Sequence, residues 1–358
     1  MIVSQLDIAS FRIIENASLQ PHPALNLITG NNGTGKSSLL EAIQCLATGH
    51  SFRTRKPREL ITHHNLDYRV TATFSDPLTE REHRAGLQRG VDGSVDLRLD
   101  FEPIKSQSDI TRLLPVKALT PDSHKLVQEG PDERRQFLDW GLFHVEPHFL
   151  DHWRNFKRAL SQRNQLLREI AHDSDIKTWN DPYVVSALEL HKARASYVET
   201  LSAALKQRLE KMETGFHVEL RYRAGWDLKQ ELDKLLVDNL STHRKMKTTT
   251  DGPHRADIAI YSNNNLAKQV LSRGQQKILV YLLHLAQLDV LQERRSSHAI
   301  ILCDDLTSEL DDIHAKALIT QLNELQSQVF VSGVNLDVLS HQGHERFHME
   351  HGDIKKGL

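Results

Sequence analysis

The sequence predicts an α/β fold with a mixed sheet, interrupted by an inserted helical domain. Apolar segments typical of buried strands lie near opposite ends of the chain, at 24–29 and 299–305, and a long stretch of helical periodicity separates them. We therefore expect both chain ends to build one head, from residues 1–146 and 247–358, with a helical arm at 147–246.

Composition limits the class of protein. The chain has 358 residues, enough for a large core and a second domain, with 39% hydrophobic and 26% charged residues. No apolar run approaches the roughly 20 residues of a membrane span, and the first residues lack the pattern of a signal peptide. Cys45 and Cys303 are the two cysteines and have no metal-ligand spacing. We expect a cytoplasmic protein without a membrane partner, and its 21 scattered histidines fit core or solvated positions.

The N-terminal part reads as strands around one helix. Residues 1–10 and 24–29 are expected strands, and residues 37–49 fit a helix that stops near Gly49. Alternation at 66–75 and 94–102 predicts antiparallel strands, with turns at 76–82 and 89–94.

The arm shows apolar residues at steps of three and four. The first seam comprises Phe149, Trp153, Phe156, Leu160, Arg163, Leu167 and Ile170. A second begins after Asp181-Pro182, a favourable helix start, and comprises Val184, Leu188, His191, Ala195, Val198, Ser202, Leu205, Leu209 and Met212. Two narrow seams predict a coiled-coil-like hairpin whose second helix, about 30 residues long, would span roughly 45 Å. Long helices packed on the core are the alternative.

A phosphate-binding loop follows the strand at 24–29. The segment GNNGTGKSS has the G-x-x-x-x-G-K-[ST] pattern and comprises Gly30, Asn31, Asn32, Gly33, Thr34, Gly35, Lys36, Ser37 and Ser38. Its backbone N–H groups and the following helix N-terminus suit phosphate oxygens, Lys36 suits the β- and γ-phosphates, and the Ser37 hydroxyl suits Mg²⁺. Because a strand precedes the motif and a helix follows it, a chance match is a poor explanation.

Two carboxylates end the strand at 299–305. Asp304 suits the metal, directly or through water, and Asp305 suits the water that attacks the γ-phosphate. A solvated loop start is the alternative for such a pair, but the phosphate loop makes it a poor one. The expected cofactors are ATP and Mg²⁺, with Lys36, Asp304 and Asp305 as the catalytic set.

A second phosphate-friendly segment precedes a helix at 270–280. It contains Ser272, Arg273, Gly274 and Gln275, which offer a hydroxyl and several N–H groups to an anion. Since the chain already has a phosphate loop, we expect this segment to contact the γ-phosphate bound by a second copy. Twofold pairing would then place two ATP molecules in one interface and make dimerisation depend on ATP.

These motifs together resemble a known set. GNNGTGKSS, LSRGQQK (271–277), IILCDD (300–305) and SELD (308–311) resemble the Walker A, signature, Walker B and D-loop motifs of ABC-type ATPases. Their placement around a helical arm resembles the SMC-like branch, and segments 51–54, 126–140 and 251–258 are similar to the RecF family of bacterial recombination mediators. The resemblance covers essentially the whole chain.

The resemblance implies an ABC-type head and adds Asp311, in the D-loop, to the nucleotide-contacting residues. It further implies a homodimer formed with ATP, binding of double-stranded and gapped DNA, and weak DNA-dependent ATP hydrolysis that acts as a switch. RecR, RecO and RecA are the implied partners, in recombinational repair, replication-fork maintenance and the SOS response.

The chain departs from the ABC-type pattern at three places. The second carboxylate is Asp305, where Glu is usual; no histidine stands near 332–334, and no convincing Q-loop glutamine stands near 120–123. Fast, transporter-like hydrolysis is therefore not expected.

DNA contact must come from local charge, because the formal net charge is −2. The candidate basic clusters are Arg53, Arg55, Lys56 and Arg58; Arg244, Lys245 and Lys247; and Arg154, Lys157, Arg158 and Arg163. Each run alone is more often a solvated face. No recognition helix or stacking motif is visible, so contacts to the DNA backbone are expected.

Three other classes fit less well. A GTPase would carry N-K-x-D, but VNLD at 334–337 lacks the lysine. The nucleotide subunit of a membrane transporter is disfavoured by the helical arm and the missing histidine. A nuclease or translocating motor is disfavoured because neither a metal-ligand set for strand cleavage nor helicase-type motifs occur.

Overall fold

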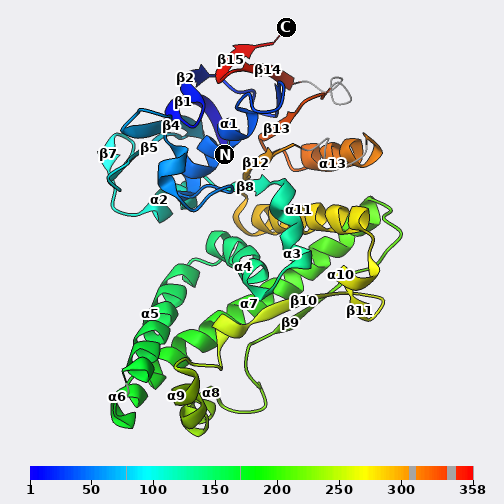
Figure 1. Cartoon of the computed structure of the whole chain (residues 1–358). Coiled ribbons are helices and arrows are strands. Elements are labelled where there is room, and N and C mark those ends of the chain that lie inside the picture. The colour runs from blue at the N-terminus through cyan, green and yellow to red at the C-terminus, as the bar shows by residue number, and fades with distance from the viewer. Residues whose placement is uncertain (78, 170, 306–311, 337–343, 358) are drawn as a thin grey trace. The chain divides into compact units, whose positions relative to one another are not determined.

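The computed structural model describes residues 1–358 except 78, 170, 306–311, 337–343 and 358. Two compact units divide the chain (Figure 1): one contains Met1–Ser123 and Lys277–Leu358, the other His124–Gln276. The first unit thus contains both chain ends and the second is a single insertion. The domain limits expected at 146/147 and 246/247 stay a prediction.

The first unit contains an antiparallel sheet in the order β2-β1-β4-β5-β6-β7. Its strands are β1 (Ile2–Phe11), β2 (Ile14–Leu19), β4 (Asp67–Ser75), β5 (Glu82–Gly90), β6 (Val95–Leu99) and β7 (Glu102–Pro103). Burial alternates along β4 as the sequence pattern predicts, with Tyr68, Val70 and Phe74 on the core face.

The second sheet joins the two chain ends in the order β15-β14-β3-β13-β12-β8. Its strands are β3 (Leu25–Thr29), β8 (Val116–Leu119), β12 (Ile300–Cys303), β13 (Val329–Gly333), β14 (His344–Glu350) and β15 (Asp353–Lys356). All neighbours are parallel except β14 and β15. The carboxyl ends of β3, β13 and β12 therefore meet at one edge, although β3 is more than 270 residues from the other two in sequence.

Helix α1 (Lys36–Thr48) contacts strands of both sheets. Ten of its 13 residues are buried; seven of these are apolar, and the other three are Lys36, Ser38 and Glu41. The other helices of this unit are α2 (Gln107–Leu113), α13 (Asp312–Glu324) and most of α11 (Arg273–Arg295), with short 3₁₀ turns at η1 (Pro57–Leu60) and η2 (Pro121–His124).

The second unit is mainly helical, with a small three-stranded sheet in the order β11-β10-β9. Its elements are α3 (Lys125–Gln128), α4 (Pro131–Val145), α5 (Phe149–Arg168), α6 (Asp173–Lys177), α7 (Asn180–Lys211), β9 (Glu219–Arg223), α8 (Leu232–Asp238), α9 (Leu240–Met246), η3 (Pro253–Arg255), β10 (Asp257–Ser262), β11 (Asn265–Leu266) and α10 (Ala267–Val270). Helices α5 and α7 pack on each other, as the two seams predict, while α7 also contacts α4, α8 and β9.

The buried seam of α7 agrees only in part with the expected one. Val198, Leu205 and Leu209 are buried as expected, but Leu188 is 46% exposed. The core face also includes Tyr183, Ala187, Leu190, Arg194, Tyr197 and Leu201. The prediction was wrong for the first half of the helix. Tyrosine and arginine count as polar in the sequence pattern, yet their apolar parts are buried while their polar ends find partners. In the first seam, Phe149, Phe156, Arg163 and Leu167 are buried as expected, and Ile170 lies outside the described residues.

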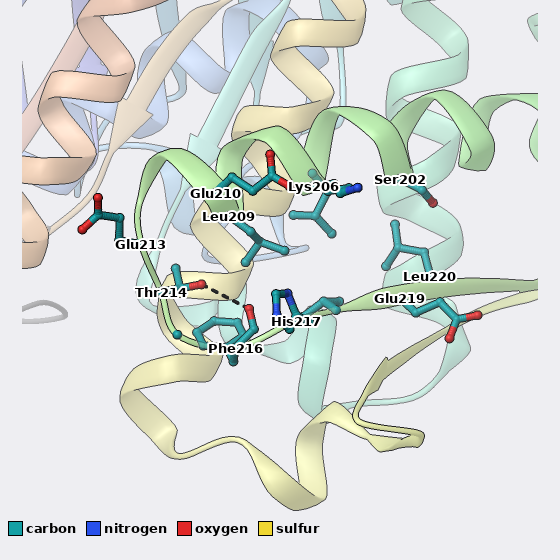
Figure 2. A pocket seen from close by; sticks show the side chains of 13 residues that line it. Ser202, Lys206, Leu209, Glu210, Glu213, Thr214, Phe216, His217, Glu219 and Leu220 are labelled. Carbon is teal, nitrogen blue, oxygen red and sulfur yellow. Dashed lines mark hydrogen bonds between the residues drawn. The ribbon is translucent and has the colours of Figure 1, made fainter.

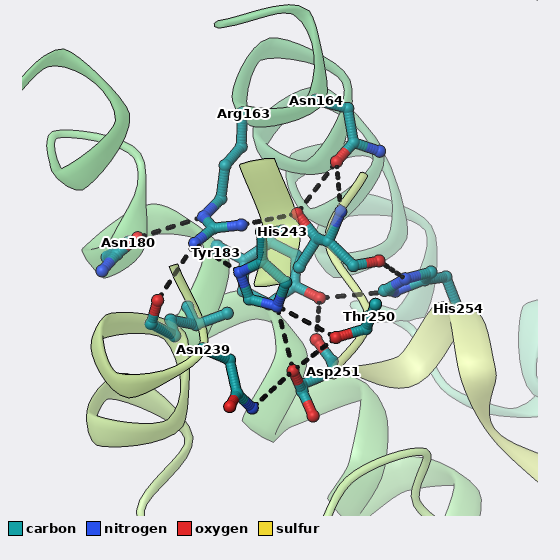
Figure 3. Close-up of polar contacts among 11 residues, drawn as sticks. Arg163, Asn164, Asn180, Tyr183, Asn239, His243, Thr250, Asp251 and His254 are labelled. Carbon is teal, nitrogen blue, oxygen red and sulfur yellow. Dashed lines mark hydrogen bonds and ion pairs between the residues drawn. The ribbon is translucent and has the colours of Figure 1, made fainter. Parts of the chain in front are cut away.

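Arg163 is the centre of a buried polar cluster (Figure 3). Its guanidinium donates to Asn180 Oδ1 at 3.2 Å, Thr249 Oγ1 at 2.7 Å and His243 Nδ1 at 3.2 Å, and the other ring nitrogen of His243 lies 3.0 Å from Asp251 Oδ2. The cluster ties α5 and α7 to the 249–251 segment. Arg163 is fully buried, so the expectation that it belongs to a DNA-binding face is wrong.

Candidate nucleotide-binding site

The phosphate loop connects β3 to α1 through backbone conformations that glycine permits. Gly30 and Gly35 have φ of 148° and 111°, in the region that other residues avoid. A Cβ at Gly30 would lie 2.4 Å from the carbonyl oxygen of Met349, so neighbouring β14 also requires a glycine there. Gly35 caps α1 without a side-chain hydrogen bond, which leaves the first helical N–H groups available for an anion.

Lys36 lies across this loop. Its Nζ donates to the carbonyl oxygens of Gly30 and Asn31, both at 2.8 Å, and the residue is 7% exposed. Burial lowers the pKa of Lys36, and the nearby carboxylates of Asp305 and Asp304 oppose that effect. The amine is therefore held at the loop by carbonyl groups that phosphate oxygens could replace.

Asp304 is the polar centre on the other side of the site. Its Oδ1 accepts from the Ser37 hydroxyl at 2.8 Å and from the Ser332 hydroxyl at 2.8 Å. Burial raises the pKa of Asp304, while the hydrogen bonds from Ser332 and Ser37 and the charge of Arg53 oppose the rise. A partly desolvated carboxylate of this kind gains from a bound cation.

The donor atoms fit Mg²⁺. Neighbouring ligands of an octahedral ion at about 2.1 Å lie about 3 Å apart, close to the observed separation of Ser37 Oγ and Asp304 Oδ1. Both are oxygen ligands, which Mg²⁺ prefers. Within the described residues there is no group of three or more His, Cys, Asp or Glu side chains that could hold a metal ion.

A cavity of about 610 Å³ joins these groups. It is formed within the first unit, and its lining residues are Arg12, Ile13, Asn32, Gly33, Gly35, Lys36, Ser37, Ser38, Arg53, Glu59, Ile61, Pro121, Asp304, Asp305 and Ser332. The volume is in the usual range for a ligand site. The structure thus brings the predicted phosphate loop and the two aspartates into one cavity.

Several residues of this cavity were not assigned to the nucleotide site from sequence, and three of them, Ser332, Arg12 and Arg53, are charged or bonded to the predicted site. Ser332 bonds Asp304 and also accepts from the backbone N–H of Asp305 at 2.9 Å, so it fixes both carboxyl-bearing residues. The parallel pairing of Cys303 with Val331 places Ser332 there. The available signal in the sequence was the apolar run at 328–333, which is typical of a strand that follows the one at 299–305. Arg12 directly follows β1, and the sequence places Arg53 in a candidate DNA-binding cluster and in the RecF-like segment 51–54.

The signature segment belongs to the other unit, at the start of α11. Ser272, Arg273 and Gly274 are exposed, and the Ser272 hydroxyl accepts from the Gln275 N–H at 3.2 Å while Gln275 Oε1 accepts from the Ser272 N–H at 2.9 Å. This reciprocal pair is a capping box, and it fixes the serine hydroxyl at the helix start. Asp311 and the D-loop lie outside the described residues.

A second cavity, of about 600 Å³, lies between the end of α7 and the start of β9 (Figure 2). Leu205, Leu209 and Phe216 form its apolar wall, and the phosphate-loop residues are not among those that line it.

In the part of the chain that the structure describes, no helix has the length and apolar character needed to cross a membrane.

Comparisons with known proteins identify the family. The RecF/RecN/SMC N-terminal domain family matches residues 2–353. The DNA replication and repair proteins RecF of Shewanella baltica strain OS223 and of Shewanella sp. strain W3-18-1 are 38% and 37% identical over 358 residues, 99% of each chain. The chain belongs to the RecF family. The family prediction from sequence motifs is confirmed.

Solved structures agree with this assignment and with the fold. The recombination mediator RecF with ATP, from the RecFOR pathway, matches with a TM-score of 0.91 at 25% identity over 100% of this chain and 98% of that one. An SMC head bound to the C-winged helix domain of ScpA matches with a TM-score of 0.63 at 16% identity, covering 100% of this chain and 97% of that one. At this level of identity the match shows similarity of fold only. The predicted ABC-type, SMC-like head with a helical insertion is confirmed.

Proposed function

We propose that this RecF-family chain is an ATP-switched DNA-binding protein of recombinational repair and replication-fork maintenance. One observation carries the proposal: a single cavity contains the phosphate loop, Lys36, and a serine–aspartate pair with the spacing of Mg²⁺ ligands. The names of the relatives, which concern DNA replication and repair and a structure with ATP, support the biological assignment.

The loop of residues 30–38 would bind the phosphates of ATP through its backbone N–H groups and Lys36. Ser37 and Asp304 would hold Mg²⁺, which supplies charge neutralisation at the phosphates. Asp305 would orient the attacking water, and the Ser332 hydroxyl that binds its backbone N–H would keep it in place. Because Asp is shorter than the usual Glu, we expect weak hydrolysis that resets the protein.

The signature segment would complete the site of a second copy. Ser272 to Gln275 are exposed or half-exposed at the N-terminus of a 23-residue helix, where an anion is favourable. A γ-phosphate held by one subunit would therefore stabilise its contact with the other, and ATP would favour the homodimer. Asp311 of the D-loop is proposed for the same interface, on resemblance only.

The closed dimer would bind double-stranded DNA beside single-strand gaps. Of the expected clusters, Arg53, Arg55, Lys56 and Arg58 are exposed, although Arg53 also lines the nucleotide cavity and Lys56 pairs with Glu59. Arg244 pairs with Asp173. Work with RecR and RecO in loading RecA is proposed from the family resemblance, supported by the RecFOR assignment of the structural relative.

Sedimentation with and without Mg²⁺-ATP tests the central step. Wild type should be monomeric without nucleotide and dimeric with it, and Ser272→Arg should remain monomeric while still binding ATP. The matched control is Ser296→Arg at the opposite end of α11, where the residue is also exposed and a positive charge suits the helix C-terminus. A mass that is independent of ATP in wild type, or a dimer of Ser272→Arg, would contradict the proposal.

A further inference from the structure

A buried carboxylate lies behind the phosphate-binding cavity. Glu41 of α1 is fully buried, four residues after Ser37 and thus on the same side of the helix. Arg12 binds it with two parallel hydrogen bonds, from Nε to Oε2 and from a terminal nitrogen to Oε1, both 2.7 Å long. The hydrogen bonds that Arg12 donates to Glu41 are also the main reason that the pKa of Arg12 is raised. Charge-assisted bidentate pairs of this geometry are strong and directional.

The same carboxylate anchors the turn at 51–54. The Ser51 hydroxyl donates to Glu41 Oε1, and it accepts from the backbone N–H groups of Arg53 at 2.8 Å and Thr54 at 3.0 Å. The guanidinium of Arg53 lies 3.9 Å from Glu41 Oε2, and its side chain is 48% exposed. Glu41 therefore anchors the turn that carries Arg53, and its charge attracts the guanidinium of that residue.

Both arginines line the cavity that contains Lys36 and Asp304. The charge of Arg53 reaches Asp304, where it opposes the effect of burial. Arg12 and Arg53 thus share one cavity with the residues proposed to bind the phosphates and Mg²⁺. Three cations around one cavity repel each other, and the negative charge of Glu41 offsets this repulsion without entering the cavity.

We propose that Glu41 is a positioning residue of the nucleotide site: it holds Arg12 and Arg53 beside the terminal phosphate and thereby sets the preference for a nucleoside triphosphate over a diphosphate. The inference rests on the proposed binding of ATP at this cavity. Glu41 itself touches no nucleotide and acts through the two arginines. The shape of its contacts explains why a carboxylate is needed: it must accept from two donors of Arg12 and one of Ser51 at once.

Glu41→Gln tests the proposal. The variant keeps the side-chain volume but removes the charge and places amide N–H groups against the donors of Arg12. We expect the Kd for Mg²⁺-ATP to rise at least tenfold and the Kd for Mg²⁺-ADP to rise less than threefold, measured by isothermal titration calorimetry on the full chain. Glu82→Gln is the matched control, since Glu82 is exposed on β5 and does not line the cavity; both constants should stay within twofold of wild type. A parallel loss for ATP and ADP would indicate a merely structural role and overturn the inference.

A double-mutant cycle separates action through Arg53 from a direct effect. If Glu41 acts through that arginine, Glu41→Gln should weaken ATP binding much less in an Arg53→Gln background; full additivity would contradict it. Should Glu41→Gln not fold, Ser51→Ala replaces it, because it releases the 51–54 turn without changing charge and should raise the Kd for ATP two- to fivefold. An unchanged Kd would overturn the inference. Wild type that does not bind Mg²⁺-ATP would instead contradict the proposed function itself.

Discussion

Replacing Lys36 with Met should separate the stability of the free protein from its response to nucleotide. Lys36 is 7% exposed, and burial lowers the pKa of its amine, so the charge costs folding free energy that two carbonyl hydrogen bonds offset. Met fills a similar volume without the charge, and water in the open cavity can bind the released carbonyl oxygens. We therefore expect the unfolding free energy without nucleotide to change by only about 1 kcal/mol.

The response to nucleotide should nearly vanish. One to two charge-assisted hydrogen bonds to phosphate, at about 1.5–3 kcal/mol each, correspond to roughly a hundredfold loss of affinity. At an ATP concentration of about 100 times the wild-type Kd, ATP stabilises wild type by about 2.7 kcal/mol but the variant by only about 0.4 kcal/mol. At roughly 2–4 °C per kcal/mol, ATP should raise the Tm of wild type by about 5–10 °C and that of the variant by about 1 °C.

Differential scanning fluorimetry with and without Mg²⁺-ATP measures both quantities. Lys36→Met with a wild-type ATP shift would refute the assignment of Lys36 to phosphate binding. A large loss of Tm without nucleotide would refute the account of its burial, because it would show that the buried charge stabilises the fold.

Three further predictions concern other groups. Asp304→Asn should weaken ATP binding at least tenfold in the presence of Mg²⁺ but less than threefold in EDTA. An equal loss of affinity under the two conditions would show that Asp304 does not bind the metal. Arg163→Met should destabilise the helical unit by about 3–5 kcal/mol in urea, because buried acceptors of the guanidinium lose their donor; a change below about 1 kcal/mol would show that the cluster does not depend on it. Burial lowers the pKa of His254 from its usual 6.5 to about 4, so between these pH values the imidazole is protonated in the unfolded chain but neutral in the folded one. The folded state therefore has its full stability above pH 6.5 and should lose about 3 kcal/mol of it as the pH falls toward 4. Urea unfolding midpoints that do not fall between pH 7 and pH 5 would contradict this.

Much of the fold followed from local pattern. The predicted strand at 24–29, the helix at 37–49 and the arm helices correspond to β3, α1, α5 and α7, within one or two residues where both ends were predicted. These segments carry strong signals: apolar runs, glycines at the loop and a proline in the first turn of α7. The buried face of α7 was predicted less well than its position in the chain. The physical cause is that Tyr183 and Arg194 bury their apolar parts while their polar ends bond to Asp251 and Asp139.

The sequence by itself determined the family, the fold class and the identity of the phosphate loop, because glycine conformation and residue chemistry at fixed spacing are local properties. Only the tertiary structure placed Ser332 between Asp304 and Asp305, and Arg12 and Arg53 around Glu41. These contacts join residues 10 to 29 positions apart in the chain, and sheet pairing and helix packing, not sequence spacing, set their distances. A buried carboxylate such as Glu41 looks like ordinary helix surface in the sequence, and its three hydrogen-bond donors appear only once the strands and turns around α1 are in place.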